Sequence, residues 1–165
     1  LTEEKILQEK LNLKPAIGNS FENIKLLDKK DIYAKAYIDE GGFDSTDTQL
    51  QSVEMDDQLS LTPEFPYNWM YDGSRPQMPG FEMEITCKSL FLIFKDSGEM
   101  DVGKADVFVN DVYCMTADPH KNNWLHCNAV LLFWETESRS HKVRITVTEE
   151  DQNKKFTILG FGYTI

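Results

Sequence analysis

The stretch "FEMEITCKSLFLIFKD", residues 81–96, indicates the fold class of this chain. In its first half apolar and polar residues alternate, which predicts a half-buried strand with Phe81, Met83, Ile85 and Cys87 on its buried face. The second half, "SLFLIFK" (89–95), is apolar on both faces, as expected of a strand at the centre of a packed sandwich.

The same period of two continues on both sides of this stretch. Further strands are predicted in "ENIKLLD" (22–28), "DIYAKAYID" (31–39), "KADVFVNDVYCMT" (104–116), "NAVLLFWE" (128–135), "HKVRITVTE" (141–149) and "KFTILGFGYT" (155–164). Asn110 and Asp111 tolerate positive φ, so they predict a tight hairpin. Polar clusters at 135–140 and 149–154 are expected to separate the later strands. Some eight or nine strands predict an all-β fold, an antiparallel β-sandwich of the jelly-roll type.

Composition excludes two classes of partner. The chain has 165 residues and a formal net charge of −11, a field that repels phosphate backbones and argues against nucleic acid. The longest apolar runs, "LFLIF" and "AVLLFW", are far shorter than the roughly 20 residues that span a bilayer, so no membrane partner is expected. Cys87, Cys114 and Cys127 cannot all pair within one molecule, and free thiols beside apolar runs favour a reducing, cytoplasmic compartment.

Residues 1–18 differ from the rest. Thr2 is a suitable N-cap, Ile6, Leu7 and Leu11 share one helical face, and Pro15 ends the pattern, which predicts a short N-terminal helix. The chain does not begin with methionine. We therefore expect residues 1–18 to be a helix or linker from a missing upstream catalytic domain, followed by a β-sandwich domain over 19–165.

The aromatic stretch "TPEFPYNWMYDG", residues 62–73, is the first candidate binding site. On an extended backbone, Phe65, Tyr67, Trp69 and Tyr71 would lie on one side and could stack on sugar rings. Alternatively, these rings close the end of the sandwich or pack on a neighbouring domain. The second candidate is Trp124 with His120, Asn122 and Asn123, a combination of ring and amide groups that suits carbohydrate.

Catalytic and metal signals are weaker. Neither a GxSxG nor a GDS-type block occurs, and His120, His126 and Asp118 have no evident nucleophile. No cofactor is expected, apart from a weak structural calcium candidate whose possible ligands are Asp39, Glu40, Asp44 and Asp47. Their spacing does not follow the EF-hand loop, and a solvated acidic turn is the alternative.

Several stretches resemble the C-terminal domain of bacterial SGNH/GDSL-type hydrolases, from residue 18 to the end. The resemblance is carried by "TPEFPYNWMYDG" (62–73), "ITCKSLFLIFKDS" (85–97), "KADVFVNDVY" (104–113), "DPHKNNWLHCNAV" (118–130) and "KKFTILGFGY" (154–163). The resemblance implies a carbohydrate-module jelly roll appended to an esterase or lipase-like domain. The catalytic blocks of that family belong to the other domain, so no catalytic residue is carried over.

Three functional hypotheses follow. The first is a non-catalytic accessory domain that packs on its own upstream catalytic domain, with carbohydrate as a candidate ligand. The second is a purely structural interdomain scaffold, which predicts an exposed apolar patch that includes Trp69 or Tyr71, and self-association. The third is an independent hydrolase with a site near His120 and His126.

Overall fold

The computed structural model describes residues 5, 21–31, 36–54 and 61–165. Within these residues every paired strand is antiparallel to its partner, and one short 3-10 turn, η2 (Glu149–Asp151), follows β9. The strands are β1 (Lys25–Leu27), β2 (Ala36–Asp39), β3 (Ser52–Glu54), β4 (Leu61–Pro63), β5 (Trp69–Tyr71), β6 (Phe81–Asp96), β7 (Ala105–Val109), β8 (Val112–Ala117), β9 (His126–Val147) and β10 (Phe156–Thr164).

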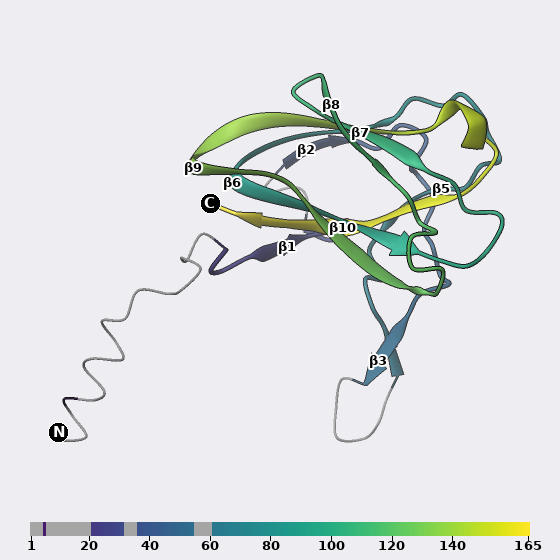
Figure 1. Ribbon diagram of the computed structural model, residues 1–165, viewed down its shortest axis with the longest axis horizontal. Coiled ribbons are helices and arrows are strands. Elements are labelled where there is room, and N and C mark those ends of the chain that lie inside the picture. The colour runs from purple at the N-terminus through teal and green to yellow at the C-terminus, as the bar shows by residue number, and fades with distance from the viewer. Residues whose placement is uncertain (1–4, 6–20, 32–35, 55–60) are drawn as a thin grey trace.

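The strands form two facing layers that share β6 and β9 (Figure 1). The first half of β6 pairs with β2 and with the second half of β9, which continues to β7 and β8. The second half of β6 pairs with β10 and with the first half of β9, while β1 and β5 pair with opposite halves of β10. The prediction of an antiparallel β-sandwich is therefore confirmed, and its jelly-roll connectivity stays a prediction.

The strand that indicated the fold changes its buried face at its midpoint. Phe81, Met83, Ile85 and Cys87 face the core, each at 0–2 % exposure, as predicted. After a register shift between Cys87 and Ser89 the inward residues become Leu90, Leu92 and Phe94. At this shift a single residue of β6, Lys88, stands against residues 135–138 of β9, and after this break in the ladder the buried positions of β6 fall on the other set of alternate residues. This is how β6 passes from one layer to the other.

The later part of the chain differs from the prediction. The polar cluster 135–140 was expected to separate two strands, but β9 runs through it without a break from His126 to Val147. Glu135 to Ser140 instead form the bend where β9 crosses between the layers. Three short strands, β3, β4 and β5, also occur outside the predicted strands.

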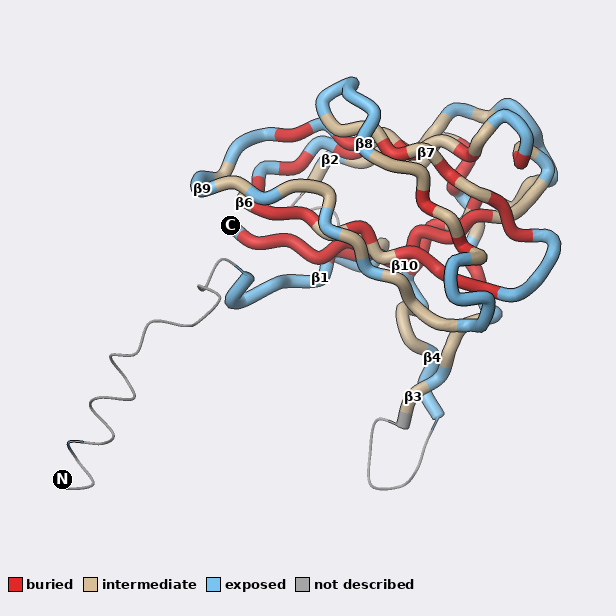
Figure 2. Tube along the Cα trace, viewed as in Figure 1, coloured by how far each residue is buried: buried red, intermediate tan, exposed pale blue. Residues whose placement is uncertain are grey.

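The core lies between the layers and is rich in aromatic rings. Phe81 stacks on Phe161 with ring centroids 5.7 Å apart, and Phe94 stacks on Phe156 at the same distance. Figure 2 shows buried chain along β10 and most of β6, whereas β1 and the tip between β7 and β8 are exposed. β6 and β10 therefore form the buried centre to which the other elements attach.

The hairpin between β7 and β8 matches its prediction. Val109 pairs with Val112, and the two residues between them, Asn110 and Asp111, have φ of 51° and 64°. β3 and β4 form a separate two-stranded arm that projects from the sandwich (Figure 1).

The predicted N-terminal helix falls on residues 1–18, which apart from Lys5 lie outside the described residues. Among the residues that the structure describes, no helix is both long and apolar enough to cross a bilayer.

Candidate functional site

The aromatic stretch 62–73 folds into the core rather than along the surface. Trp69 is fully buried, with its ring centroid 5.3 Å from that of Phe81, and its indole nitrogen donates to Glu40 Oε1 at 3.2 Å. Tyr71 is 3 % exposed, and its hydroxyl donates to the Gln152 carbonyl at 2.6 Å. Burial raises the pKa of the Tyr71 phenol. Neither ring is available as a platform or as an exposed patch, so these two expectations are wrong.

The rest of that stretch departs from an extended path. Phe65 has a φ of 55°, which interrupts the alternation that would have aligned the four rings. Tyr67 is 45 % exposed, with the Lys30 ammonium 5.2 Å from its ring centroid. Of the rings named in the predicted platform, Tyr67 is the one with a substantial free surface, and it stands alone.

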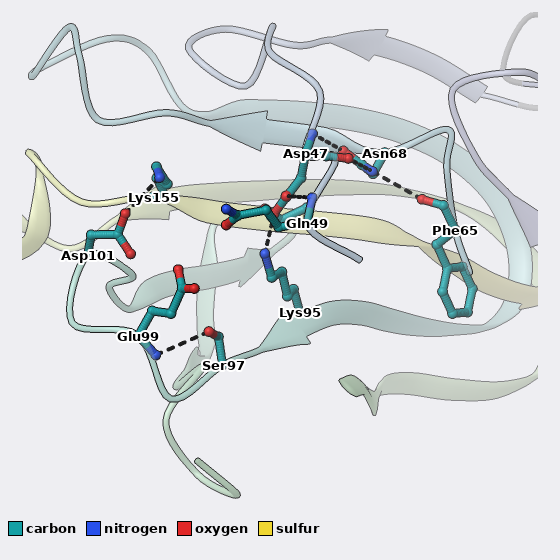
Figure 3. A network of polar contacts seen from close by, with 10 residues as sticks. Asp47, Gln49, Phe65, Asn68, Lys95, Ser97, Glu99, Asp101 and Lys155 are labelled. Atoms are coloured by element: carbon teal, nitrogen blue, oxygen red, sulfur yellow. Dashed lines mark hydrogen bonds and ion pairs between the residues drawn. The ribbon is translucent and has the colours of Figure 1, made fainter. Parts of the chain in front are cut away.

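A buried polar network holds the stretch in place (Figure 3). Asp47 Oδ2 accepts from Lys95 Nζ at 2.8 Å and from the Thr157 hydroxyl at 2.7 Å. Asn68, fully buried, accepts from the Asp47 backbone N–H and donates to the Asp47 and Phe65 carbonyls. Because a buried charge needs a partner, Asp47 and Lys95 together fix the segment that delivers Trp69 to the core.

The four acidic residues considered for calcium are occupied by different partners. Asp39 accepts from the Gly41 backbone N–H, Glu40 lies 3.4 Å from Lys29 Nζ, and Asp47 pairs with Lys95. Asp44 pairs with Arg75. Across the described parts of the chain no group of three or more His, Cys, Asp or Glu side chains is arranged to hold a metal ion.

Trp124 lies in the loop before β9 and is 56 % exposed. Its ring stacks on His126 with centroids 4.4 Å apart and planes 12° from parallel. His126 Nδ1 lies 3.1 Å from the Trp124 carbonyl, to which it donates, so Nε2 accepts from Asn122 Nδ2 at 3.0 Å. The Asn122 backbone N–H and amide also donate to Asp96. We call the stacked pair of Trp124 and His126, with the Asn122 amide beside it, the Trp124 platform. Hydrogen bonds within the chain orient it.

The other predicted members of this site lie around it. Asn123 adopts a φ of 58° and is exposed, which turns the loop toward Trp124. His120 is held away by its own contacts, since its Nε2 lies 3.0 Å from the Val102 carbonyl and its backbone N–H donates to Asp118. His126 also lines a small recess together with apolar side chains that include Leu50, Phe65, Leu125 and Leu159.

The hydrogen-bond partners of the histidines also bear on catalysis. His120 contacts a backbone carbonyl, and His126 contacts a carbonyl and an amide. Among the hydrogen bonds of the described residues, neither imidazole has a serine or cysteine as partner. Burial raises the pKa of all three cysteine thiols, that of Cys87 to about 11 with a further contribution from Glu135. Cys87 is buried, Cys127 half-buried and Cys114 exposed, and a thiol whose pKa is raised is a poor nucleophile near neutral pH.

The structure reveals a surface that the sequence reading missed. On the outside of the layer formed by β1, β10, β6 and β9, apolar side chains gather over two glycines of β10. Gly160 and Gly162 leave room for Leu26 and Ile24, which lie directly above them. We call this surface the outer hydrophobic face, and its members are Phe21, Ile24, Leu26, Phe91, Leu131 and Trp134.

Contacts show that these residues form one continuous surface. The Phe21 ring lies edge-on to Phe91 at 5.5 Å and 6.2 Å from Trp134, while Phe91 is the register partner of Leu131. Five of the six side chains are 41–54 % exposed. The signal for this face was the run "NAVLLFWE", in which apolar residues occupy both sides of a strand. Burial of one side leaves Leu131 and Trp134 on the other.

Comparison with solved structures identifies the fold. A two-domain esterase (CEX) active on acetylated mannans, co-crystallised with mannopentaose, matches with a TM-score of 0.62 and 14% identity, over 97% of this chain and 43% of that chain. A second structure, also described as a two-domain esterase (CEX) active on acetylated mannans, gives 0.58 and 15%, over 93% of this chain and 39% of that chain. This chain therefore spans about two fifths of the length of those esterases. The expected resemblance to the β-sandwich part of multidomain esterases is confirmed at the level of the fold.

A more distant match is a family 35 carbohydrate binding module from Clostridium thermocellum. It has a TM-score of 0.45 and 14% identity, over 87% of this chain and 99% of that chain. No protein-family model matches the sequence, and no curated protein is significantly similar to it.

Proposed function

We propose that this chain is a non-catalytic accessory module of a larger SGNH/GDSL-type carbohydrate esterase. In this proposal residues 19–165 form the module, and the module packs on the catalytic domain through its outer hydrophobic face. The fold that this chain shares with part of two-domain esterases supports its place as one module of a larger esterase. The observation that carries the proposal is the face itself, because isolated domains seldom expose so many adjoining large apolar side chains.

The position of the face suits a covalently attached domain. Phe21, which precedes β1, belongs to the face, and Ile165 lines the same pocket as Trp134 at its edge. In this proposal the upstream domain lies against this side of the sandwich. Fully burying a large apolar side chain contributes about 1.5–3 kcal/mol, and since five of the six are already about half-buried, covering the face adds about half of that for each.

The test uses the natural polypeptide that carries this chain, with a charge placed in the face. Leu131→Asp should separate one cooperative thermal transition into two and expose the junction to proteolysis, since the two domains would no longer stabilise each other. The matched control is Leu61→Asp, because Leu61 is 71 % exposed on β4 of the projecting arm. Indistinguishable calorimetric traces for the two variants would refute the docking role, as would a natural polypeptide without a second domain.

A second function is favoured by the Trp124 platform. An exposed indole that is oriented by His126 and bordered by the amides of Asn122 and Asn123 offers an apolar ring face with hydrogen-bonding groups at its edge, which suits a pyranose. The module would then hold carbohydrate near the attached esterase. Isothermal titration with plant and bacterial polysaccharides should detect binding that Trp124→Ala weakens at least tenfold. Heat changes that are equal for wild type and variant would eliminate this platform.

A further inference from the structure

The carboxylate of Asp96, at the end of β6, has few hydrogen-bond donors. Asp96 is fully buried, and no hydrogen bond from the described residues reaches its Oδ1 atom. Its Oδ2 atom accepts two long hydrogen bonds, from the Asn122 backbone N–H at 3.3 Å and from Asn122 Nδ2 at 3.5 Å. Because a buried acceptor without a donor costs stability, this carboxylate has room for a further and stronger donor.

A candidate for that donor is His126, the register partner of Asp96 on β9. Register partners on antiparallel strands project from the same face of the sheet, with Cα atoms about 4.5–5.5 Å apart. Asn122 Nδ2 stands against both side chains, 3.0 Å from His126 Nε2 and 3.5 Å from Asp96 Oδ2. A single amide therefore separates an imidazole from a carboxylate.

The hydrogen bonds of His126 require the neutral imidazole. Its Nδ1 donates to the Trp124 carbonyl at 3.1 Å and so carries the proton, which leaves Nε2 as an acceptor for Asn122. A second proton, on Nε2, would turn this acceptor into a donor. Histidine is the side chain that makes such a change between pH 5 and pH 8.

The Asn122 amide cannot satisfy both neighbours once His126 is charged. In its present orientation, the amide N–H would face the N–H of the imidazole. Rotated by half a turn, the amide oxygen would accept from the imidazole but would also face Asp96 Oδ2, which is an acceptor. Because each orientation opposes like groups, we expect the amide to leave and Nε2–H to donate to Asp96. That hydrogen bond is charge-assisted and therefore stronger than those it replaces.

The other titratable groups around His126 do not oppose this exchange. Asp96 faces it from β6, and Glu64, Lys95 and Cys127 share the recess that His126 lines. Lys95 is already held in its buried ion pair, and burial raises the pKa of the Cys127 thiol, which stays neutral. A charged imidazole therefore meets carboxylates on two elements, and the cation among these groups is already engaged.

The stack of His126 on Trp124 is expected to survive the exchange. The hydrogen bond from Nδ1 to the Trp124 carbonyl is the same in both protonation states, and a charged ring against an indole gains a cation–π attraction. The loop loses more, because Asn122 supplies both of the hydrogen bonds that join it to Asp96.

We propose that His126 is a proton-operated switch for the loop that carries Trp124. Neutral His126 accepts from Asn122 and keeps the loop attached to β6. Protonated His126 donates to Asp96 and releases Asn122 to solvent. The rearrangement needs no ligand, whereas its effect on binding rests on the second function proposed above, because the released amide belongs to the Trp124 platform.

The test is an NMR titration of the ¹⁵N-labelled chain between pH 8 and pH 5, the range in which histidine changes charge. At pH 8 His126 should carry its proton on Nδ1. As the pH falls, the side-chain amide signals of Asn122 should move with the same midpoint as the ring nitrogens of His126, toward the values of a solvent-exposed asparagine. The indole signal of Trp69 should stay constant, which shows that the core is intact.

Three variants separate this switch from other titrations. His126→Gln should make the Asn122 signals independent of pH. His120→Gln, a change in the same loop, should keep the response of wild type. Asp96→Asn removes the charge that receives the imidazole, so the Asn122 signals should move only at a lower pH than in wild type.

Asn122 signals that do not follow His126, or a response that survives in His126→Gln, would overturn the switch. If one of the polysaccharides of the calorimetric test binds wild type, its affinity should fall several-fold from pH 8 to pH 5. In Asn122→Ala the affinity should be lower and equal at both pH values. Absence of binding at either pH would refute the carbohydrate function alone, because the titration of Asn122 reports the switch without a ligand.

Discussion

Two aromatic segments of this molecule, residues 65–71 and 131–134, have opposite fates. The first is the densest aromatic cluster in the chain, yet Trp69 and Tyr71 are buried in the core. The second belongs to a strand whose composition suggests a core, yet Leu131 and Trp134 are 45 % and 54 % exposed. Aromatic density in a sequence therefore indicates where rings lie along the chain, and the path of the backbone decides which of them meet solvent.

The cause of the difference is local. In the first segment, the Asp47–Lys95 pair and Asn68 hold the chain so that β5 pairs with β10 and Trp69 points inward. In the second, a bulge in the pairing of β6 with β9 leaves Trp134 on the outer surface. Each segment thus depends on a feature outside the aromatic residues themselves, and the following substitutions test that dependence.

The largest effect is expected for Trp69→Ala. Removing a fully buried indole leaves a cavity next to Phe81 and Phe161 and releases the Glu40 carboxylate. The free energy of unfolding should fall by about 3–5 kcal/mol, measured by urea denaturation. A loss below about 1 kcal/mol would mean that Trp69 is not a core residue, and the contrast between the segments would disappear.

Asp47→Ala should follow closely, because it leaves Lys95 charged and buried without its partner. The expected loss is about 3 kcal/mol in the same denaturation measurement. The double variant Asp47→Ala/Lys95→Met removes both charges and should recover part of it. Equal stabilities for the single and the double variants would show that the ion pair does not hold the 65–71 segment.

Trp134→Ala is expected to change stability little. Its indole is more than half exposed and contacts mainly Phe21, so the free energy of unfolding should change by less than about 1 kcal/mol. Thermal and urea unfolding of this variant beside Trp69→Ala give the contrast directly. If both variants lose several kcal/mol, the outer face belongs to the core of the isolated chain and cannot be a binding surface.

The smallest effect concerns ester hydrolysis. An accessory module should hydrolyse p-nitrophenyl acetate at the background rate, and His120→Ala and His126→Ala should leave that rate unchanged. Initial rates at several protein concentrations measure this. Turnover that is proportional to protein and lost in His126→Ala would restore the hypothesis of an independent hydrolase.

Much of the fold follows from the sequence because two kinds of local signal agree with it. The alternation at Phe81, Met83 and Ile85 matches the buried face, and Asn110-Asp111 forms the expected two-residue turn. The change of face after Cys87 could not be predicted, since residues 89–95 are apolar on both faces and the irregularity lies in their pairing with β9. The polar run at 135–140 looks like a turn and is a bend within β9, where residues 135–138 lie between the paired residues Trp134 and Arg139 without register partners on β6.

The candidate sites were harder to predict than the fold. Trp124 with Asn122 was identified because ring and amide residues are adjacent in sequence. Asp96 lies far from His126 in the sequence, and only the folded chain makes them neighbours. The outer hydrophobic face likewise depends on the glycines at 160 and 162. Their role could not be predicted from the sequence, because it consists in leaving room for Leu26 and Ile24 of another strand.

The pairing of β1 with β10 has a mechanical consequence. Lys25 lies opposite Tyr163 and Leu27 opposite Phe161, so the first and last strands run side by side in opposite directions, with their outer ends together (Figure 1). A force that pulls residue 21 away from residue 165 would load these hydrogen bonds one after another, as in unzipping, rather than all at once in shear. Under tension between its ends, β1 would peel off first and uncover the glycine strip of β10, while the sandwich held together by β6 and β9 stayed intact.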